Sequence, residues 1–347
     1  MKTGLYFILL SLLSISCTNE SEMDDSNDSV DSTEVQLHQR ATSLFGALPD
    51  GLEYGSDKTV LGRELYFEKK LSINNEISCN SCHMLDKYGV DNLAVSPGHD
   101  GKVGERNSPS VYNAVFHLAQ FWDGRAMDLV EQAKGPITNP IEMGMASDLD
   151  AVKKIAEEEG YKELFSKVYG DTEEAVSFDN IADAIAEYEK TLVTPSRFDS
   201  YIAGDFSALT SEEKEGMVEF IDAGCITCHA GNTFGGKMYQ KFGLINGPYW
   251  DYTGSERQDR GRAEVTGNDS EEYFFKVPSL RNVEKTSPYF HDGSVAELSK
   301  AVEIISITQT GKELTPEQVD KIVTFLKALT GDIPEHANEP KEMASAE

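Results

Sequence analysis

Two copies of the pentapeptide Cys-x-x-Cys-His constrain this 347-residue chain more than any other feature of its sequence. The first copy occupies residues 79–83 and the second occupies residues 225–229. Within such a pentapeptide, two thiols in one turn can bond the two vinyl groups of one porphyrin, and the adjacent histidine can ligate the iron. A zinc site or a thioredoxin-like redox pair would also use paired cysteines, but neither requires a histidine after both second cysteines. The pattern therefore predicts two covalently attached haems of the c type.

Each motif assigns one pair of attachment residues and one iron ligand. The attachment cysteines are Cys79 and Cys82 in the first motif and Cys225 and Cys228 in the second, and the proximal iron ligands are His83 and His229. A disulfide scaffold is not expected in a chain this long with only five cysteines.

Residues 1–16 have the composition of an export signal. Lys2 provides a positive charge, and residues 5–13 form an apolar run that is too short for a comfortable membrane span. Residues 14–17 resemble a bacterial lipoprotein cleavage box. We therefore expect a periplasmic protein that is lipidated on Cys17 and tethered to a membrane only by that anchor. Ordinary signal cleavage with an incidental cysteine is the alternative.

Charge and composition limit the partners and mark the ends of the chain. The formal net charge of −29 argues against a nucleic-acid partner and is compatible with steering of a basic protein. Residues 17–35 are acidic and polar and contain no Lys or Arg, so they predict a flexible stalk. Residues 336–347 are expected to form a flexible tail.

A helical pattern precedes each haem motif, and a second helical pattern follows the long segment after each motif. Apolar residues fall at helical spacing over residues 60–66, and a capping box at Thr210 opens the corresponding pattern before the second motif. Apolar residues also recur at helical spacing over residues 181–192, and a capping box at Thr315 opens the last pattern.

The order helix, haem motif, long loop, helix thus occurs twice. No long alternating strand pattern is present in the sequence. We therefore predict a mostly α fold of two tandem cytochrome c-type domains with long irregular loops, each binding one covalent haem c. The expected boundaries are residues 36–200 for the first domain and residues 201–335 for the second.

Several further segments resemble the bacterial di-haem cytochrome c peroxidases, the family that includes MauG. The segments cover residues 106–114, 119–126, 131–143, 277–283 and 287–293. The similarity extends over roughly residues 40–331. It implies a peroxidatic first domain and an electron-transfer second domain. It also implies reduction of hydrogen peroxide by a small donor protein, either a cytochrome c or a cupredoxin, and a homodimer.

The resemblance implies roles for four side chains of the first domain. His99, on a glycine-rich segment, matches a distal iron ligand that is released on activation. Glu142 matches the distal acid, because a carboxyl group beside peroxide can move a proton between its two oxygens. Gln132 matches a hydrogen-bonding residue of the same pocket, and Trp122 matches an aromatic that conducts electrons between the haems. Taken alone, each of these residues has an ordinary reading as a solvated loop, surface or core residue.

A calcium site between the domains is implied by the resemblance and not by residue spacing. Asn107 and the backbone carbonyls of Thr286 and Pro288 match its ligands. Oxygen donors of this kind suit a hard divalent cation.

The sequence departs from the family at the second haem. Alignment of residues 301–311 places Ile305 where a methionine ligand is usual and where the MauG branch has a tyrosine. No Met, His or Tyr lies between residues 292 and 335. Either Met238 or His291 reaches the iron, or this haem is five-coordinate or binds water. We expect no methionine ligand, a lower potential and more high-spin character.

Three functions remain open at this point. The leading one is a di-haem cytochrome c peroxidase that reduces hydrogen peroxide to water. The others are a MauG-like enzyme that oxidises another protein and a di-haem electron carrier without turnover. The presence of His99, Gln132 and Glu142 disfavours the carrier, because electron transfer alone needs no proton-handling pocket.

Overall fold

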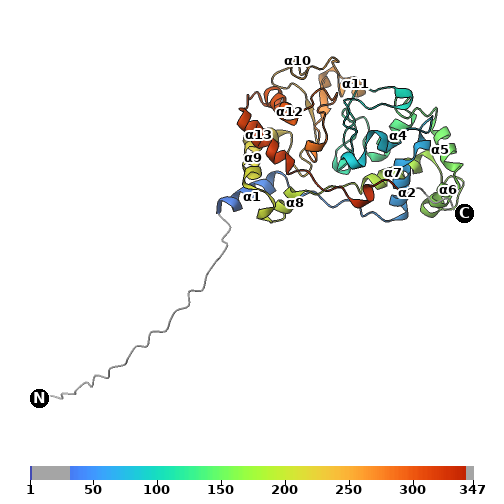
Figure 1. Ribbon diagram of the computed structural model, residues 1–347, viewed down its shortest axis with the longest axis horizontal. Helices are drawn as coiled ribbons and strands as arrows, with labels where there is room; N and C mark the ends of the chain where they lie inside the picture. Colours follow the sequence, from blue (N-terminus) through green and yellow to red (C-terminus); the bar gives the residue numbers. More distant parts are fainter. Residues whose placement is uncertain (2–31, 341–347) are drawn as a thin grey trace.

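The computed structural model describes Met1 and residues 32–340, and the chain within that range is mostly helical (Figure 1). The helices are α1 (Ser32–Leu44), α2 (Asp57–Phe67), α3 (Cys79–Cys82), α4 (Leu129–Thr138), α5 (Asp148–Ala156), α6 (Glu159–Tyr169), α7 (Phe178–Glu189), α8 (Arg197–Ile202), α9 (Ser211–Asp222), α10 (Trp250–Thr253), α11 (Ala263–Thr266), α12 (Leu298–Ile305) and α13 (Pro316–Lys327). The strands β1 (Tyr239–Lys241) and β2 (Phe274–Lys276) form one antiparallel pair. The expected mostly α fold is confirmed.

Helices α2 and α7 pack against each other in the first domain, on either side of the first haem motif in sequence. Gly62 lies at their crossing, where an added Cβ would stand 1.9 Å from the carbonyl oxygen of Ala184. Only glycine allows the two backbones to approach this closely. Helix α2 contains the helix that was predicted over residues 60–66.

Helices α9 and α13 repeat this arrangement in the second domain. Gly216 lies at their crossing, where an added Cβ would stand 2.1 Å from the carbonyl oxygen of Lys321. Both capping boxes predicted here are formed, one at Thr210 and one at Thr315. Each cap satisfies backbone N–H groups that the first turn of a helix leaves unpaired.

The N-terminal helix does not belong to the domain that follows it in sequence. Helix α1 lies beside α8 and α9 (Figure 1), and Ala41 and Phe45 are buried in the core of the second domain. The Phe45 ring stacks on the ring of Phe234, with centroids 4.5 Å apart. The stalk expected over residues 17–35 also differs, because residues 32–35 are the first turn of α1. The predictions for residues 1–16 and Cys17 lie outside the described residues.

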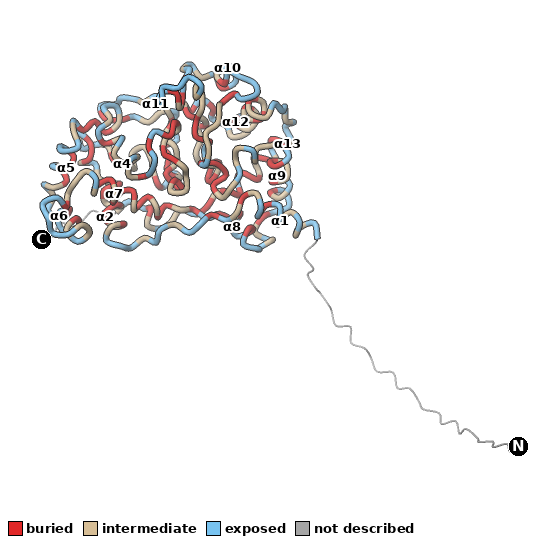
Figure 2. The backbone as a smooth tube through the Cα atoms, turned by 180° about the vertical axis from the view of Figure 1, so that it is seen from behind, coloured by how far each residue is buried: buried red, intermediate tan, exposed pale blue. Residues whose placement is uncertain are grey.

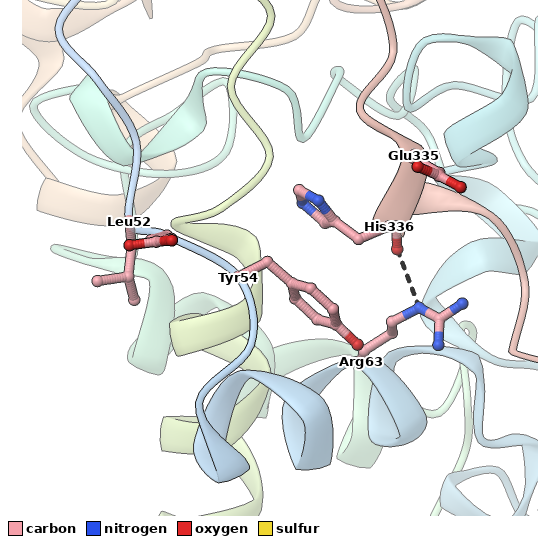
Figure 3. A pocket seen from close by; sticks show the side chains of 6 residues that line it. Leu52, Tyr54, Arg63, Glu335 and His336 are labelled. Atoms are coloured by element: carbon pink, nitrogen blue, oxygen red, sulfur yellow. Dashed lines mark hydrogen bonds between the residues drawn. The ribbon is translucent and has the colours of Figure 1, made fainter.

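The C-terminal segment crosses in the opposite direction. After α13 the chain returns to the first domain, where Ala337 is buried in its core. The His336 ring stacks on Tyr54 with centroids 4.6 Å apart, and Arg63 donates to the His336 carbonyl at 2.9 Å (Figure 3). Residues 336–338 are thus packed, although a flexible tail was expected from residue 336. Their short, polar sequence gave no periodic pattern from which this contact could be predicted.

Each domain therefore has its own core, and the two cores exchange terminal segments. Buried residues lie in both halves of the molecule and along the boundary between them (Figure 2). The exchange shifts the boundary away from the expected division at residue 200, because α8 and residues 41–45 pack in the second core. No helix among residues 32–340 is long and apolar enough to cross a membrane.

Candidate active site

The first haem motif forms a single helical turn, α3, directly against α2. The Tyr66 hydroxyl donates to the carbonyl of His83 at 2.8 Å and so fixes the end of the motif. Cys79 and Cys82 are both free thiols although they share one turn. Burial raises the pKa of Cys82 to about 11 and the pKa of Cys79 further still. Two unpaired thiols in one turn, followed directly by a half-buried histidine, fit covalent haem attachment.

The second haem motif holds its histidine in a defined orientation. His229 Nδ1 lies 2.7 Å from the carbonyl oxygen of Phe234, so this nitrogen carries the proton and donates it. Burial lowers the pKa of His229 to about 4, which keeps the ring neutral. A neutral imidazole whose Nδ1 is the donor has a free lone pair on Nε2, the form that ligates iron. The residues of this motif therefore also fit haem.

The loop that carries His99 lies against the segment that carries Glu142. The backbone N–H of His99 donates to the carbonyl of Glu142 at 2.8 Å. Gly144 faces the imidazole, and a Cβ on this residue would stand 2.4 Å from His99 Nε2. The sequence-predicted distal residues are thus brought together, and a glycine makes the contact possible.

The His99 ring is turned toward protein partners in this structure. Its Nε2 lies 2.8 Å from the carbonyl oxygen of Pro140 and 3.0 Å from Nζ of Lys102. Its Nδ1 lies 3.2 Å from a carboxylate oxygen of Asp100. Nε2 is therefore engaged, whereas Nδ1 is buried without a hydrogen-bond partner and has only the Asp100 carboxylate beside it.

Glu142 is a partly buried acid beside the first haem motif. Its Oε1 accepts a hydrogen bond from Asn139 Nδ2 at 2.9 Å. Burial raises the pKa of Glu142, against the opposing effects of the Arg125 guanidinium and Asn139. The Glu142 carboxylate is also one of the charges that, after burial, raise the pKa of Cys82. A carboxyl group close to the motif with a raised pKa is a candidate for proton transfer at this site.

Helix α4 and the turn before it carry Gln132 and Arg125. Gln132 lies on α4, whose C-terminal end leads into the segment of Asn139 and Glu142. Arg125 stacks its guanidinium over the Phe121 ring, 3.5 Å from the centroid. Sequence reasoning overlooked Arg125, although it lies within the segment 119–126 that carried the resemblance. Its charge acts on the Glu142 carboxyl and so belongs to the site.

Trp122 lies where the two domains meet. Its Nε1 donates to the carbonyl of Asn107 at 2.9 Å, and its own carbonyl accepts from the N–H of Lys276 at 2.7 Å. The indole also meets the His291 ring edge to face, with centroids 6.4 Å apart. Trp122 therefore contacts residues from both domains.

The residues matched to a calcium site lie on the same boundary. Asn107 Nδ2 donates to the carbonyl of Leu93 at 2.8 Å. Asn92 donates to the carbonyls of Lys285 and Ser287, which flank Thr286. The loop around residue 92 is thus fastened to the segment that holds Thr286 and Pro288. Groups of acidic, Cys or His side chains able to hold a metal are absent from the described residues, but the matched ligands are amide and carbonyl oxygens.

Ile305 is the last residue of α12, directly before a wider helical turn over Ser306–Thr310. Its half-buried side chain packs against the second core. His291, one alternative ligand, is 2% exposed, and its Nε2 lies 3.3 Å from the Tyr249 hydroxyl. Burial lowers the pKa of His291 to about 4. Met238, the other alternative, is half-buried beside β1.

The sequence of this chain is similar to a family model and to several known proteins. Residues 56–207 match the family model described as di-haem cytochrome c peroxidase. The chain is 45% identical to the cytochrome c551 peroxidase of Pseudomonas aeruginosa, with 86% of this chain and 87% of that protein aligned. It is 47% identical to the cytochrome c551 peroxidase of Nitrosomonas europaea over 81% of this chain and 82% of that protein. MauG of Methylophilus methylotrophus is more distant, at 31% identity over 79% and 83%.

Solved structures agree with the fold. A MauG-like protein associated with microbial copper homeostasis superposes with a TM-score of 0.73 at 27% identity, covering 84% of this chain and 97% of that chain. The di-haem peroxidase BthA of Burkholderia thailandensis shares the fold with a TM-score of 0.67 at 20% identity, over 83% and 90%. The chain belongs to the di-haem cytochrome c peroxidase family.

Proposed function

We propose that this protein reduces hydrogen peroxide to water with electrons from a small redox protein, a cytochrome c or a cupredoxin. The observation that carries the proposal is the position of the Glu142 carboxylate, which acts on Cys82 of the first haem motif, on a segment that is hydrogen-bonded through its backbone to His99. A partly buried acid near a haem motif serves proton transfer to a bound substrate, and an electron carrier has no use for it. The relatives at 45% and 47% identity are both named as cytochrome c peroxidases.

The protein's own residues supply proton transfer and orientation at the first domain. Haem bound there through Cys79 and Cys82, with His83 on its iron, supplies the electrons for reduction of the peroxide bond. The Glu142 carboxylate accepts a proton from the inner peroxide oxygen and returns it to the outer oxygen, which leaves as water. Asn139 holds the Glu142 carboxylate in place by its 2.9 Å hydrogen bond.

Two further residues, His99 and Gln132, have roles at the same site. The contacts of the His99 ring with Pro140, Lys102 and Asp100 support a role in which it leaves the distal side on activation. Gln132 orients the substrate from α4.

Electrons reach this site from the second domain. That domain holds its haem through Cys225, Cys228 and His229, and Trp122 provides an aromatic path across the boundary. The contacts of Trp122 with both domains support this assignment.

Steady-state consumption of peroxide with a reduced cytochrome c tests the function. Oxidation of the donor at a rate that depends on peroxide supports it. A holoprotein with both haems that fails to turn over peroxide, yet oxidises a partner protein, would support the MauG-like alternative instead.

We further propose a calcium ion held by Asn107 and the carbonyls of Thr286 and Pro288. Asn107 uses its amide nitrogen for Leu93, which leaves Oδ1 available for a cation. Titration of chelator-treated holoprotein with Ca²⁺ by calorimetry tests the site, and Asn107→Ala should remove the binding. Unchanged binding in that variant contradicts the assignment.

The cellular setting is also a proposal. The signal over residues 1–16 supports a periplasmic protein, and Cys17 supports a lipid anchor. The family resemblance supports a homodimer. Mass spectrometry of the mature N-terminus and sedimentation of the purified protein test these assignments, and a Cys17 without lipid would refute the anchor.

A further inference from the structure

Lys276 is a buried cation without a carboxylate partner. It ends strand β2, is 6% exposed, and has no carboxylate within 4.0 Å of Nζ among the described residues. The nearest acid that acts on it, Asp123, is already paired with Arg106 and Arg125. Burial lowers the pKa of Lys276 to about 8. Burial of an ammonium group destabilises the folded state unless an anion compensates its charge. We therefore expect a carboxylate beside Lys276.

His117 completes a set of hydrogen-bond donors at this place. Its Nδ1 lies 3.3 Å from Nζ of Lys276, and its Nε2 is buried without a partner. Burial and the charges of Lys276 and Lys237 lower the pKa of His117 well below its ordinary value, so the ring is neutral. Because an ammonium group only donates, Nδ1 is the acceptor and Nε2 carries the proton. The pair therefore offers several N–H donors and no acceptor, a combination that recognises an anion.

The pair stands next to the second haem motif. His117 packs against Gly236, where an added Cβ would lie 2.3 Å from the imidazole Cδ2. An added Cβ on the preceding residue, Gly235, would lie 3.3 Å from His229 Nδ1. The backbone of Lys276 donates to the carbonyl of Trp122. The donors thus lie between the iron ligand of the second domain and the proposed electron path.

We propose that Lys276 and His117 bind a carboxylate, the propionate of the haem held by His229. In the part of the chain that the structure describes, no side chain supplies a carboxylate to Lys276. The propionate of this haem would supply one. The positive charge of Lys276 then favours the reduced form of that haem, because reduction adds a negative charge nearby. The charge offsets part of the loss of potential caused by Ile305 in place of methionine. The inference rests on the two bound haems and not on the peroxidase activity.

Spectroelectrochemical titration of both haems in the holoprotein tests this pair. Lys276→Met should lower the midpoint potential of the second haem by about 59 mV or more, a tenfold change in a one-electron equilibrium. Lys276→Arg should restore most of the potential, because it keeps the charge. Lys237→Met is the matched control, since Lys237 is exposed and lies beside the same histidine. It should move the potential by much less.

Two results overturn the proposal. The first is a second-haem potential in Lys276→Met that is no lower than in Lys237→Met. The second is a shift confined to the first haem, which would assign the carboxylate to the other porphyrin. If Lys276→Met yields no folded holoprotein, Lys276→Gln replaces it, because it removes the charge and keeps a polar side chain at the same place. An unchanged potential in that variant then refutes the pair. These readouts need no peroxide, so they are independent of the proposed activity.

Discussion

The indole of Trp122 and the imidazole of His291 meet edge to face across the domain boundary, 6.4 Å apart between ring centroids. The two residues occupy the same place in two copies of one turn. Residues 120–126 and 289–295 each close with an isolated antiparallel bridge between their ends. In both copies the phenylalanine before the facing ring has a positive φ, 65° in the first and 73° in the second. The boundary is therefore built from a repeated element.

The backbone contacts of these two residues are repeated as well. The N–H of Asn107 donates to the carbonyl of His291, and the N–H of Lys276 donates to the carbonyl of Trp122, both at 2.7 Å. The donors precede equivalent segments, Pro-Ser-Val-Tyr-Asn from residue 109 and Pro-Ser-Leu-Arg-Asn from residue 278. Each domain thus donates one backbone hydrogen bond to the residue that carries the facing ring of the other domain.

The first prediction concerns Trp122. Trp122→Phe keeps an aromatic ring but leaves the Asn107 carbonyl without its donor, so we expect a loss of about 1 kcal/mol in stability. We also expect slower oxidation of the second haem by peroxide, followed by stopped-flow absorbance. Trp250→Phe is the control, because the other tryptophan of the chain lies in the second domain beside Tyr249 and Tyr273. Equal electron-transfer rates in the two variants would remove Trp122 from the path.

The second prediction concerns Glu142. Glu142→Gln should lower kcat for peroxide by about 10²–10⁴-fold with unchanged haem absorption, because the amide cannot accept the proton. The base form is needed, so wild-type activity should fall as pH drops through the pKa of Glu142. Burial places this acid limb above the ordinary carboxyl value of 4.5. The limb should be absent from the variant. Glu163→Gln, on the exposed face of α6, should behave like wild type.

The third prediction concerns the sixth ligand of the second haem, which we expect not to be a methionine. Wild-type protein should lack the charge-transfer absorption of a methionine–iron bond. Ile305→Met should create that band and raise the potential of the second haem, because a thioether ligand favours reduced iron. Ile307→Met, two residues farther along the same helical segment, is the control and should do neither. A methionine band in the wild type would show that Met238 or another residue reaches the iron.

The sequence was informative about features that depend on neighbouring residues. A haem motif, a capping box and a 3.6-residue apolar period each depend on neighbours within a few residues. This is why the motifs, the caps at Thr210 and Thr315, and the helices α2 and α13 could be predicted.

Contacts between distant segments could not be predicted in this way. The residues of α1 and their neighbours in sequence do not indicate whether this helix packs on the first domain or on the second. The same holds for the docking of Ala337 on the first core and for the distance between Lys276 and His117. The repeat around Trp122 and His291 was visible in principle, since Phe-Trp-Asp-Gly and Phe-His-Asp-Gly follow matching Pro-Ser-x-x-Asn segments.

The last prediction concerns an ion pair between Asp199 and Arg281. The Arg281 side chain is fully buried and donates to both carboxylate oxygens of Asp199, at 2.5 and 2.8 Å. Asp199→Asn leaves this guanidinium without its counter-charge, so we expect a loss of about 3–5 kcal/mol at neutral pH. Asp222→Asn removes an exposed pair with Arg40 and should cost about 1 kcal/mol or less.

The effect of Asp199 should depend on pH with a definite sign. Burial by itself raises the pKa of Asp199, but the hydrogen bonds and charge of Arg281 outweigh it and lower the pKa below 3.8. A carboxyl group with a depressed pKa stabilises the folded state above its unfolded pKa, and this stability is lost as the pH falls through the folded value. The gap in melting temperature between wild type and Asp199→Asn should therefore be widest at neutral pH and shrink below about pH 4. A gap that is constant from pH 7 to pH 3 would mean that packing, and not charge, holds this junction together.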